Sequence, residues 1–275
     1  MDLEYLTSVA IEAALSAGKI IQKYMNEDIT VETKEGGSTY ESQVVTKVDR
    51  ECETSILAHL ERTCKTFSIG LLSEETQDDG SRFEKEYFWC IDPMDGTLAF
   101  IKKQPGFSVS IALIAKDGTP LIGVIFDPNS KTLYHAIKAK GAFKNQKPWV
   151  IKNTNGYLTY ITDKKLKDTP NSVNIQHILI KHKTNLGLKS IKEVSGRGAV
   201  MCAILVLENG PACFLKLPKT EKGSGSIWDY AATACIYNEL ELPAKTFTGD
   251  RLDLNKQDDS FMNEKGVYYT NLSLD

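Results

Sequence analysis

The spacing of apolar residues predicts two amphipathic helices near the N-terminus. Apolar side chains recur close to a helical period over residues 3–25, and again over 44–63. The stretch 33–42, "TKEGGSTYES", lies between them, and its paired glycines among polar residues predict a loop. The chain is therefore expected to begin with two helices joined by a loop.

Strands are predicted in the segment that follows. Short apolar runs at 67–72 ("FSIGLL") and 86–91 ("EYFWCI") are each followed closely by acidic residues. From 107 to 145, apolar runs alternate with turn sequences at 116–120 and 127–131. This rhythm predicts consecutive antiparallel strands.

The second half of the chain has a less regular pattern. The segments 157–163 and 174–183 suggest strands or mixed elements, and 212–217 suggests a short strand. Helices are predicted over 198–210, where Asn-Gly follows the apolar run, and over 228–240.

Composition and charge exclude several classes of protein. Hydrophobic residues make up 41% of the 275 and charged residues 25%, which is typical of a folded domain and not of a disordered chain. The net charge of −3 gives no electrostatic footprint for a nucleic acid polymer. The sequence shows neither a signal peptide nor a membrane-spanning apolar run, so a cytoplasmic protein is expected. Six scattered cysteines without a C-x-x-C pair predict free thiols.

Two aspartates follow the apolar run "EYFWCI", in "DPMDGT" (92–97). Pro93 fixes its own φ and pushes Asp92 toward extended backbone, so that Asp92 and Asp95 can face one pocket. Gly96 lets the backbone pass close to a ligand. Two carboxylates beside an anion site make chemical sense mainly with a divalent cation between them. The segment suggests half of a metal site, although Asp-Pro and Asp-Gly are also ordinary turn dipeptides.

Acidic residues at two further places could complete such a site. Glu74 and Glu75, in "LLSEET", follow another apolar run, and Asp229, in "SIWDYAA", stands in the first turn of a predicted helix. Taken singly, "SEET" is better explained as a capping box and Asp229 as a helix-start residue. Their combination with "DPMDGT" favours a site with oxygen ligands, which suits Mg²⁺.

Three segments together resemble the signature blocks of the inositol monophosphatase family. They are "LLSEET" (71–76), "WCIDPMDGTLAFIKKQPGFSVSIALI" (89–114) and "WDYAATACI" (228–236), in the family's order and spacing. "VVTKVDRECE" (44–53) also looks like the family's V-T-x-x-D segment. That family includes inositol monophosphatases, fructose-1,6-bisphosphatases of related fold and 3′(2′),5′-bisphosphate nucleotidases. The resemblance implies a phosphoric monoester hydrolase with two or three Mg²⁺ ions as cofactors.

The resemblance also implies the metal ligands. Glu74, Asp92 and the backbone carbonyl of Met94 would bind a first ion. Asp92 would bridge to a second ion, which Asp95 and Asp229 would also bind. On this interpretation Asp95→Asn is expected to abolish activity and to leave the fold intact, because the pocket is expected to be exposed.

Catalytic and substrate-binding residues follow from the same resemblance. Glu74, Thr97 and Asp49 would be catalytic, with Thr97 and Asp49 holding the attacking water near the first ion. Such a reaction needs no covalent enzyme intermediate. The stretch "SGRG" (195–198) lies where the family contacts the alcohol half of its substrate. The residues expected to contact the small phosphorylated substrate are Asp95, Gly96, Thr97, Ser195, Gly196, Arg197 and Asp229.

The substrate itself is predicted from a departure from the family pattern. Inositol-specific members carry a glutamate shortly before the Trp-Asp pair, whereas here "CFLKLPKTEKGSGSIWD" is longer and contains three lysines, Lys216, Lys219 and Lys222. Glu221 lies near the expected place. These lysines, or Arg197 as a fork-shaped donor, would bind a second phosphate, unless the lysines form a solvated basic loop. The favoured activity is a 3′(2′),5′-bisphosphate nucleotidase that converts 3′-phosphoadenosine 5′-phosphate to AMP, with inositol-1-monophosphatase as the alternative.

Other classes of protein fit less well. The chain lacks the Asp-x-Asp motif of haloacid-dehalogenase phosphatases, the P-loop pattern and a calcium loop. A non-catalytic metal-binding scaffold of the same fold is the alternative of another class.

The expected fold is the family's α+β arrangement, a layered αβαβα sandwich. A change in the sequence pattern near residue 150 suggests an N-terminal α+β subdomain, 1–150, with most of the metal ligands. The C-terminal subdomain, 151–275, would then carry Asp229 and the loops that set specificity. A homodimer, inhibition by lithium and the absence of any membrane or nucleic acid partner are also expected.

Overall fold

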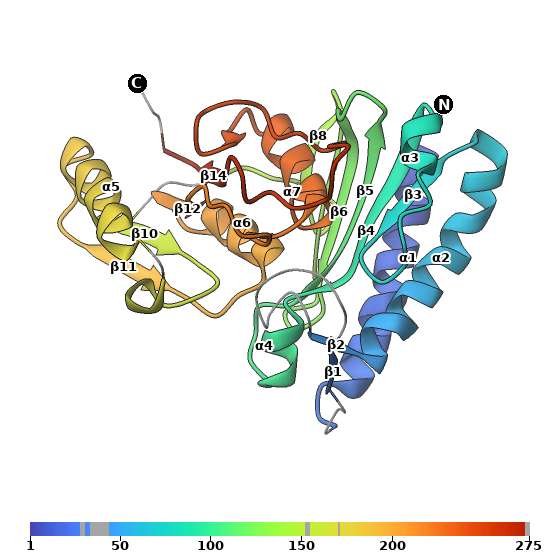
Figure 1. Cartoon of the computed structure of the whole chain (residues 1–275), viewed down its shortest axis with the longest axis horizontal. Helices are drawn as coiled ribbons and strands as arrows, with labels where there is room; N and C mark the ends of the chain where they lie inside the picture. Colours follow the sequence, from blue (N-terminus) through green and yellow to red (C-terminus); the bar gives the residue numbers. More distant parts are fainter. Residues whose placement is uncertain (28–30, 34–43, 152–154, 170, 273–275) are drawn as a thin grey trace.

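Helices and sheets alternate in five layers (Figure 1). A helical pair covers a seven-stranded sheet, two helices lie between that sheet and a five-stranded sheet, and one more helix covers the far side. The predicted αβαβα sandwich is confirmed. The computed structural model describes the chain except for residues 28–30, 34–43, 152–154, 170 and 273–275. Most of the loop predicted at 33–42 therefore lies outside the described residues.

The two N-terminal helices form where the apolar spacing predicts them. Helix α1 spans Leu3–Tyr24, and the Asp2 side chain caps it by accepting from the N–H groups of its first turn. Helix α2 spans Lys47–Phe67 and begins with a capping box made by Thr46 and Asp49. The buried faces of both helices pack on one face of the seven-stranded sheet. The burial of these faces, more than intrinsic helix propensity, stabilises both helices.

The seven-stranded sheet has the order β3-β4-β5-β6-β7-β8-β9, and only the β3–β4 pair is parallel. The predicted antiparallel run is confirmed. Because strand residues alternate between faces, Trp89 and Ile91 pack toward α1 and α2, whereas Phe88 and Cys90 pack toward the middle layer. The strands are β3 (Gly70–Ser73), β4 (Tyr87–Asp95), β5 (Ser108–Ala115), β6 (Pro120–Asp127), β7 (Thr132–Ile137), β8 (Gly141–Lys144) and β9 (Lys147–Pro148).

The five-stranded sheet has the order β11-β10-β12-β14-β13, with β10 parallel to both β11 and β12. Helix α6 (Ala199–Glu208) packs on it, and helix α7 (Ile227–Glu239) packs against α6 and the first sheet. Both helices were predicted. The strands are β10 (Leu158–Ile161), β11 (Ile191–Val194), β12 (Ala212–Lys216), β13 (Ala244–Lys245) and β14 (Val267–Thr270).

The strand or mixed element suggested for 174–183 is wrong, because these residues belong to helix α5 (Ser172–Asn185). Its fully buried side chains, Ile175 and Leu179, are four residues apart and face the second sheet. Ile180 is exposed, so the apolar run in the sequence continues around the helix instead of marking one face.

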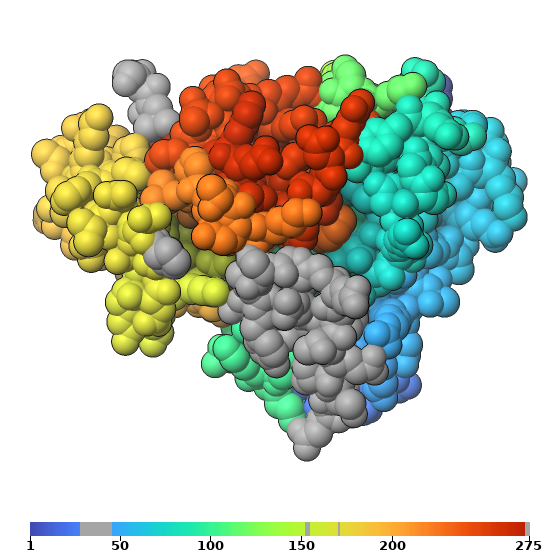
Figure 2. All heavy atoms as spheres, in the orientation of Figure 1, coloured from blue at the N-terminus to red at the C-terminus, as the bar shows by residue number. Residues whose placement is uncertain are grey.

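Short elements and a C-terminal segment complete the structure. Residues around Asn255 and Lys256 lie against the 78–85 region, where Arg82 donates to the Asn255 side chain and to the Lys256 carbonyl (Figure 2). The short elements are β1 (Val31–Thr33), β2 (Val44–Thr46), α3 (Ser81–Glu84), α4 (Thr97–Ile101) and the 3₁₀ helix η2 (Leu166–Asp168). Among the described helices, none has the length and apolar content needed to cross a bilayer. All six cysteines are free, as expected.

The chain passes from the first sheet to the second between β9 and β10, close to residue 150. Helix α7 nevertheless packs on β5 and β6 of the first sheet, although it lies in the second half of the chain. The two predicted subdomains would therefore share a core layer, and their division stays a prediction.

The contact between β6 and α7 leads to a testable prediction. A Cβ added to Gly123 would lie 2.3 Å from the Ala232 carbonyl oxygen, so Gly123→Ala should push α7 away from the sheet. We expect a loss of about 1–3 kcal/mol in the free energy of unfolding, measured by urea denaturation. Gly156→Ala is the matched control, because no atom lies within 4 Å of its added Cβ. Equal stability of the two variants would contradict this tight packing.

Candidate metal centre

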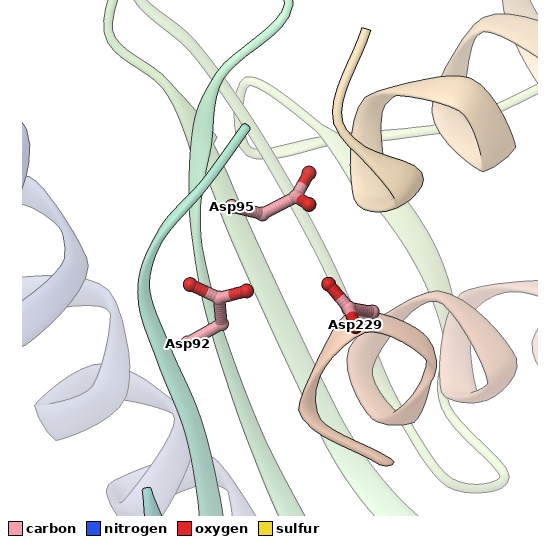
Figure 3. A group of neighbouring side chains, drawn as sticks. All are labelled: Asp92, Asp95 and Asp229. Atoms are coloured by element: carbon pink, nitrogen blue, oxygen red, sulfur yellow. The ribbon is translucent and has the colours of Figure 1, made fainter. Parts of the chain in front are cut away.

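Three aspartates from two distant parts of the chain meet in one cluster (Figure 3). Asp92 and Asp95 lie at the end of β4, and Asp229 lies in the first turn of α7. One carboxylate oxygen from each residue lies within 4.8 Å of the others. The carboxylates point toward one another, an arrangement that repulsion disfavours unless a cation is bound or protons are taken up.

Local turns hold Asp92 and Asp229 in place. Asp92 Oδ1 accepts a hydrogen bond from the Met94 N–H at 3.0 Å, while Asp92 Oδ2 is buried without a hydrogen-bond partner among the described residues. The Asp229 carboxylate accepts from the Ser226 N–H in the capping box that starts α7. An unpartnered buried carboxylate oxygen is costly in a folded protein, and a metal ligand bond would satisfy it.

Asp95 caps a helix that is remote in sequence. Its two carboxylate oxygens each accept one N–H from the start of α6, from Ala199 and Val200, both at 3.0 Å. A Cβ on Gly198 would lie 2.2 Å from Asp95 Oδ2, so this contact needs glycine. Asp95 is only 5% exposed. The expected exposed position of Asp95 is therefore wrong. The expectation that Asp95→Asn leaves the fold intact stays a prediction, and an amide nitrogen there would face a backbone N–H.

Glu74 lies beside the cluster at the end of β3. Strands β3 and β4 are parallel, and Ser73 pairs with Ile91. Glu74 and Asp92 each directly follow a member of this pair. The Glu74 N–H donates to the Ile91 carbonyl oxygen at 3.2 Å. Burial raises the pKa of Asp92 well above its ordinary value, and the Glu74 charge raises it further.

Asp49, Thr97 and Met94 form a second group on the α2 side of the cluster. The Thr97 hydroxyl lies 3.0 Å from Asp49 Oδ1 and 3.2 Å from the Met94 carbonyl oxygen. The other Asp49 oxygen accepts from the Thr46 N–H and hydroxyl. The structure thus brings together Asp49 and Thr97, which the resemblance assigned to the attacking water, and Met94, whose carbonyl it assigned to the first ion.

Among the predicted substrate contacts, Gly96 lies between β4 and α4, and Ser195, Gly196 and Arg197 lie in the loop before α6. Gly96 adopts a φ of +85°, and a Cβ there would lie 2.6 Å from the Gly106 carbonyl oxygen. That same carbonyl accepts from the Gly198 N–H at 2.7 Å, which joins the loop between α4 and β5 to the loop before α6.

The electrostatics of the cluster favour cation binding. Burial raises the pKa of Asp49 and of Asp229 to about 6, and the Glu74 charge contributes to both shifts. Burial also raises the pKa of Asp95, with the Asp229 charge next in size, although two N–H donors partly offset these effects. The donor set consists of carboxylate and carbonyl oxygens, which is the chemistry Mg²⁺ prefers. The residues present therefore fit a magnesium site.

Glu53 is a contributor that the sequence reasoning missed. Its buried carboxylate accepts hydrogen bonds from the Ser73 hydroxyl and, at 2.9 Å, from the Thr76 hydroxyl. These two contacts bracket Glu74 and fix the chain that presents it. The signal was present in "VVTKVDRECE", because Glu53 follows Asp49 by one helical turn and shares its face of α2.

Comparison with known proteins agrees with this geometry. The model of the inositol monophosphatase family matches residues 2–271. The chain belongs to the inositol monophosphatase family. The proteins of this family are phosphoric monoester hydrolases, so the chain is an enzyme of that class. The predicted family is confirmed.

Curated relatives match along most of their length. Inositol monophosphatase 1 of Solanum lycopersicum is 29% identical over 262 residues, which cover 93% of this chain and 89% of the relative. Inositol-1-monophosphatase of Bacillus subtilis is 28% identical over 236 residues, which cover 85% and 82%. A solved inositol monophosphatase from Anabaena (Nostoc) superposes with a TM-score of 0.71 at 23% identity, covering 98% of this chain and 92% of that one, and supports the fold.

The raised carboxyl pKa values lead to a prediction on pH and stability. The ordinary pKa of Asp49 is 3.8 and the folded value is about 6, so the folded chain binds this proton more tightly than the unfolded chain. Stability is then greatest below about pH 4 and is lost as the pH rises to about 6, by roughly 3 kcal/mol for this group. The melting temperature of metal-free protein should fall across this window, and the slope should be smaller in Asp49→Asn. An identical slope in the two proteins would contradict the assignment.

The Glu53 contacts predict a second, indirect effect. Glu53→Ala should weaken Mg²⁺ binding about 10- to 100-fold, because Glu74 loses the support on either side of it. Isothermal titration calorimetry with MgCl₂ provides the measurement, and Glu53→Gln, which keeps an acceptor oxygen, should lose less. Glu51→Ala serves as a control on the same helix, since Glu51 accepts from the Tyr24 hydroxyl. Similar affinities for Glu53→Ala and Glu51→Ala would show that Glu53 does not position Glu74.

Proposed function

We propose that the protein is a Mg²⁺-dependent phosphomonoesterase that hydrolyses a small phosphorylated metabolite: water would add to phosphorus, the P–O bond to the alcohol would break, and the alcohol and inorganic phosphate would be released. Bound Mg²⁺ would supply the activation of the water. The observation that supports this most directly is the cluster of Asp92, Asp95 and Asp229, with a buried Asp92 oxygen that has no hydrogen-bond partner among the described residues. A site built only from oxygen donors has little use without a hard divalent cation.

The residues at the cluster would divide the ions between them. Glu74, Asp92 and the Met94 carbonyl would hold one Mg²⁺, and Asp92, Asp95 and Asp229 would hold a second. When bound, the ions supply a lowered water pKa and positive charge for the phosphate and leaving oxygens. Family membership supports this assignment, and a third ion is compatible with it.

Thr97 and Asp49 would position the water. Since the Thr97 hydroxyl donates to Asp49 Oδ1, its own oxygen remains able to accept a hydrogen bond from a water molecule. Glu74, which directly follows strand β3, would be the third catalytic residue. Backbone N–H groups of Gly96 and Thr97 would contact the phosphate, and Ser195, Gly196 and Arg197 would contact the alcohol half of the substrate.

Two substrate classes are proposed. A bisphosphate nucleotide such as 3′-phosphoadenosine 5′-phosphate is favoured by basic residues in two segments of the sequence, Arg197 and the lysines of 216–222. Inositol 1-phosphate is favoured by the names of the curated relatives, which are inositol monophosphatases. The homodimer, the cytoplasmic location and lithium inhibition stay predictions that follow from the family.

Phosphate release tests the proposal. In Mg²⁺, the protein should release phosphate from 3′-phosphoadenosine 5′-phosphate, from inositol 1-phosphate or from both. Asp92→Asn should lower kcat/KM by more than about a hundredfold, because loss of a supporting residue alone costs up to that much. Asp127→Asn is the matched control, since Asp127 also precedes a proline but only accepts from Asn129 and Ser130 in a turn. Near-native turnover in Asp92→Asn, or no release by the native enzyme with Mg²⁺ bound, would refute the proposal, and the second result would favour a metal-binding scaffold.

A further inference from the structure

The basic residues proposed for the second phosphate, Arg197, Lys216 and Lys222 among them, differ in what they contact. Arg197 donates to the Pro105 carbonyl oxygen and packs against Gly106, so it ties two loops together. Lys222 is 62% exposed at its side chain and lies 3.5 Å from Asp259. Each of these two side chains therefore already contacts a second loop.

Lys216 has a different position. It is the last residue of β12, its side chain is only 15% exposed, and its Nζ lies 3.1 Å from Asp163 Oδ2. Strands β10 and β12 are parallel with Ile161 opposite Phe214, so Asp163 and Lys216 each stand two residues beyond that pair. The ion pair therefore lies at the carboxyl ends of parallel strands, where open α/β sheets bind their ligands.

Hydrogen bonds through the loop before α6 join this ion pair to the aspartate cluster. From Asp95, hydrogen bonds lead to the start of α6, and the Gly196 N–H in the preceding loop donates to the Asp163 carbonyl oxygen at 3.0 Å. Asp229 is also among the negative charges that act on Lys216. Burial lowers the pKa of Lys216, but the negative charges around it, including Asp163 and Asp229, outweigh burial and raise it.

We propose that Lys216 binds a second anionic group on the leaving-group side of the substrate, with Asp163 holding the ammonium in place. This inference rests on the phosphomonoesterase function proposed above. The Lys216 ammonium group has three N–H donors. Because Asp163 Oδ2 engages only one side of it, other N–H groups can donate to a ligand. The cluster carboxylates would repel a second anion, and a largely buried ammonium at the end of β12 would offset that repulsion. A neutral polyol would gain nothing from such a charge.

Two matched pairs of substrates test the inference. The first pair is 3′-phosphoadenosine 5′-phosphate and adenosine 3′-phosphate, which differ only in the second phosphate. The second pair is 2-phosphoglycerate and glycerol 2-phosphate, which differ in a carboxylate. The native enzyme should show a higher kcat/KM for the doubly anionic member, by about tenfold or more, because a charge-assisted hydrogen bond is lost in the other. The pair with the larger ratio identifies phosphate or carboxylate as the second group.

Variants then assign the preference to one side chain. Lys216→Met should lower the ratio about tenfold while the rate on the singly charged member changes little, and Lys216→Arg should restore part of the ratio. Lys144→Met on β8, which breaks an ion pair with Glu208, should keep the native ratio. An equal loss on both members of a pair would overturn the inference in favour of a structural ion pair.

Measurements on the native enzyme separate this inference from the function on which it rests. Release of phosphate from both members of each pair at equal kcat/KM would overturn the role of Lys216 and leave the phosphomonoesterase intact. No release from these substrates or from inositol 1-phosphate in Mg²⁺ would refute the proposed function itself. Because this comparison needs no variant, it decides the question even if Lys216→Met does not fold.

Discussion

Mutual repulsion among the buried carboxylates of Asp92, Asp95 and Asp229 constrains the rest of this structure. Like charges this close destabilise a folded chain unless donors, protons or cations offset them. Each carboxylate accepts backbone N–H groups from a different source: the Met94 turn, the start of α6 and the start of α7. The strand, the two middle helices and their loops must therefore meet at one point, and the five layers are arranged around it.

Asp95 shows how closely folding and the candidate chemistry are coupled. The same carboxylate that would bind a metal also caps α6, and Gly198 is needed because a side chain would collide with it. Gly96 has a similar role, since the Gly106 backbone passes close to it. Helix α6 packs on the second sheet, so the end of β4 in the first sheet helps to orient the second. Supporting residues such as Glu53 extend this coupling to α2 and to the chain that carries Glu74.

The negative charge of the cluster also bears on the role of the ion pair between Lys216 and Asp163. A pocket with this much negative charge can accept a doubly anionic substrate only if positive charge is supplied on the leaving-group side as well as by bound metal. Lys216 is largely buried and paired with Asp163, whereas Arg197 and Lys222 support loops. On the role proposed for Lys216, its position at the end of β12 would connect the fold to the choice between a nucleotide and a polyol.

Local sequence patterns predicted most elements and the acidic residues of the site, because the spacing of apolar residues determines which face of a helix or strand is buried. The same patterns failed for α5, where exposed Ile180 blurs the helical face. They could not reveal that Asp95 caps α6, that Glu53 supports Glu74, or that Lys216 pairs with Asp163. The two α6 contacts join residues 104 and 105 positions apart, and the ion pair joins strands that are not consecutive in the chain. Such contacts exist only once the layers have packed, because tertiary packing, not local spacing, decides which ends of distant elements meet.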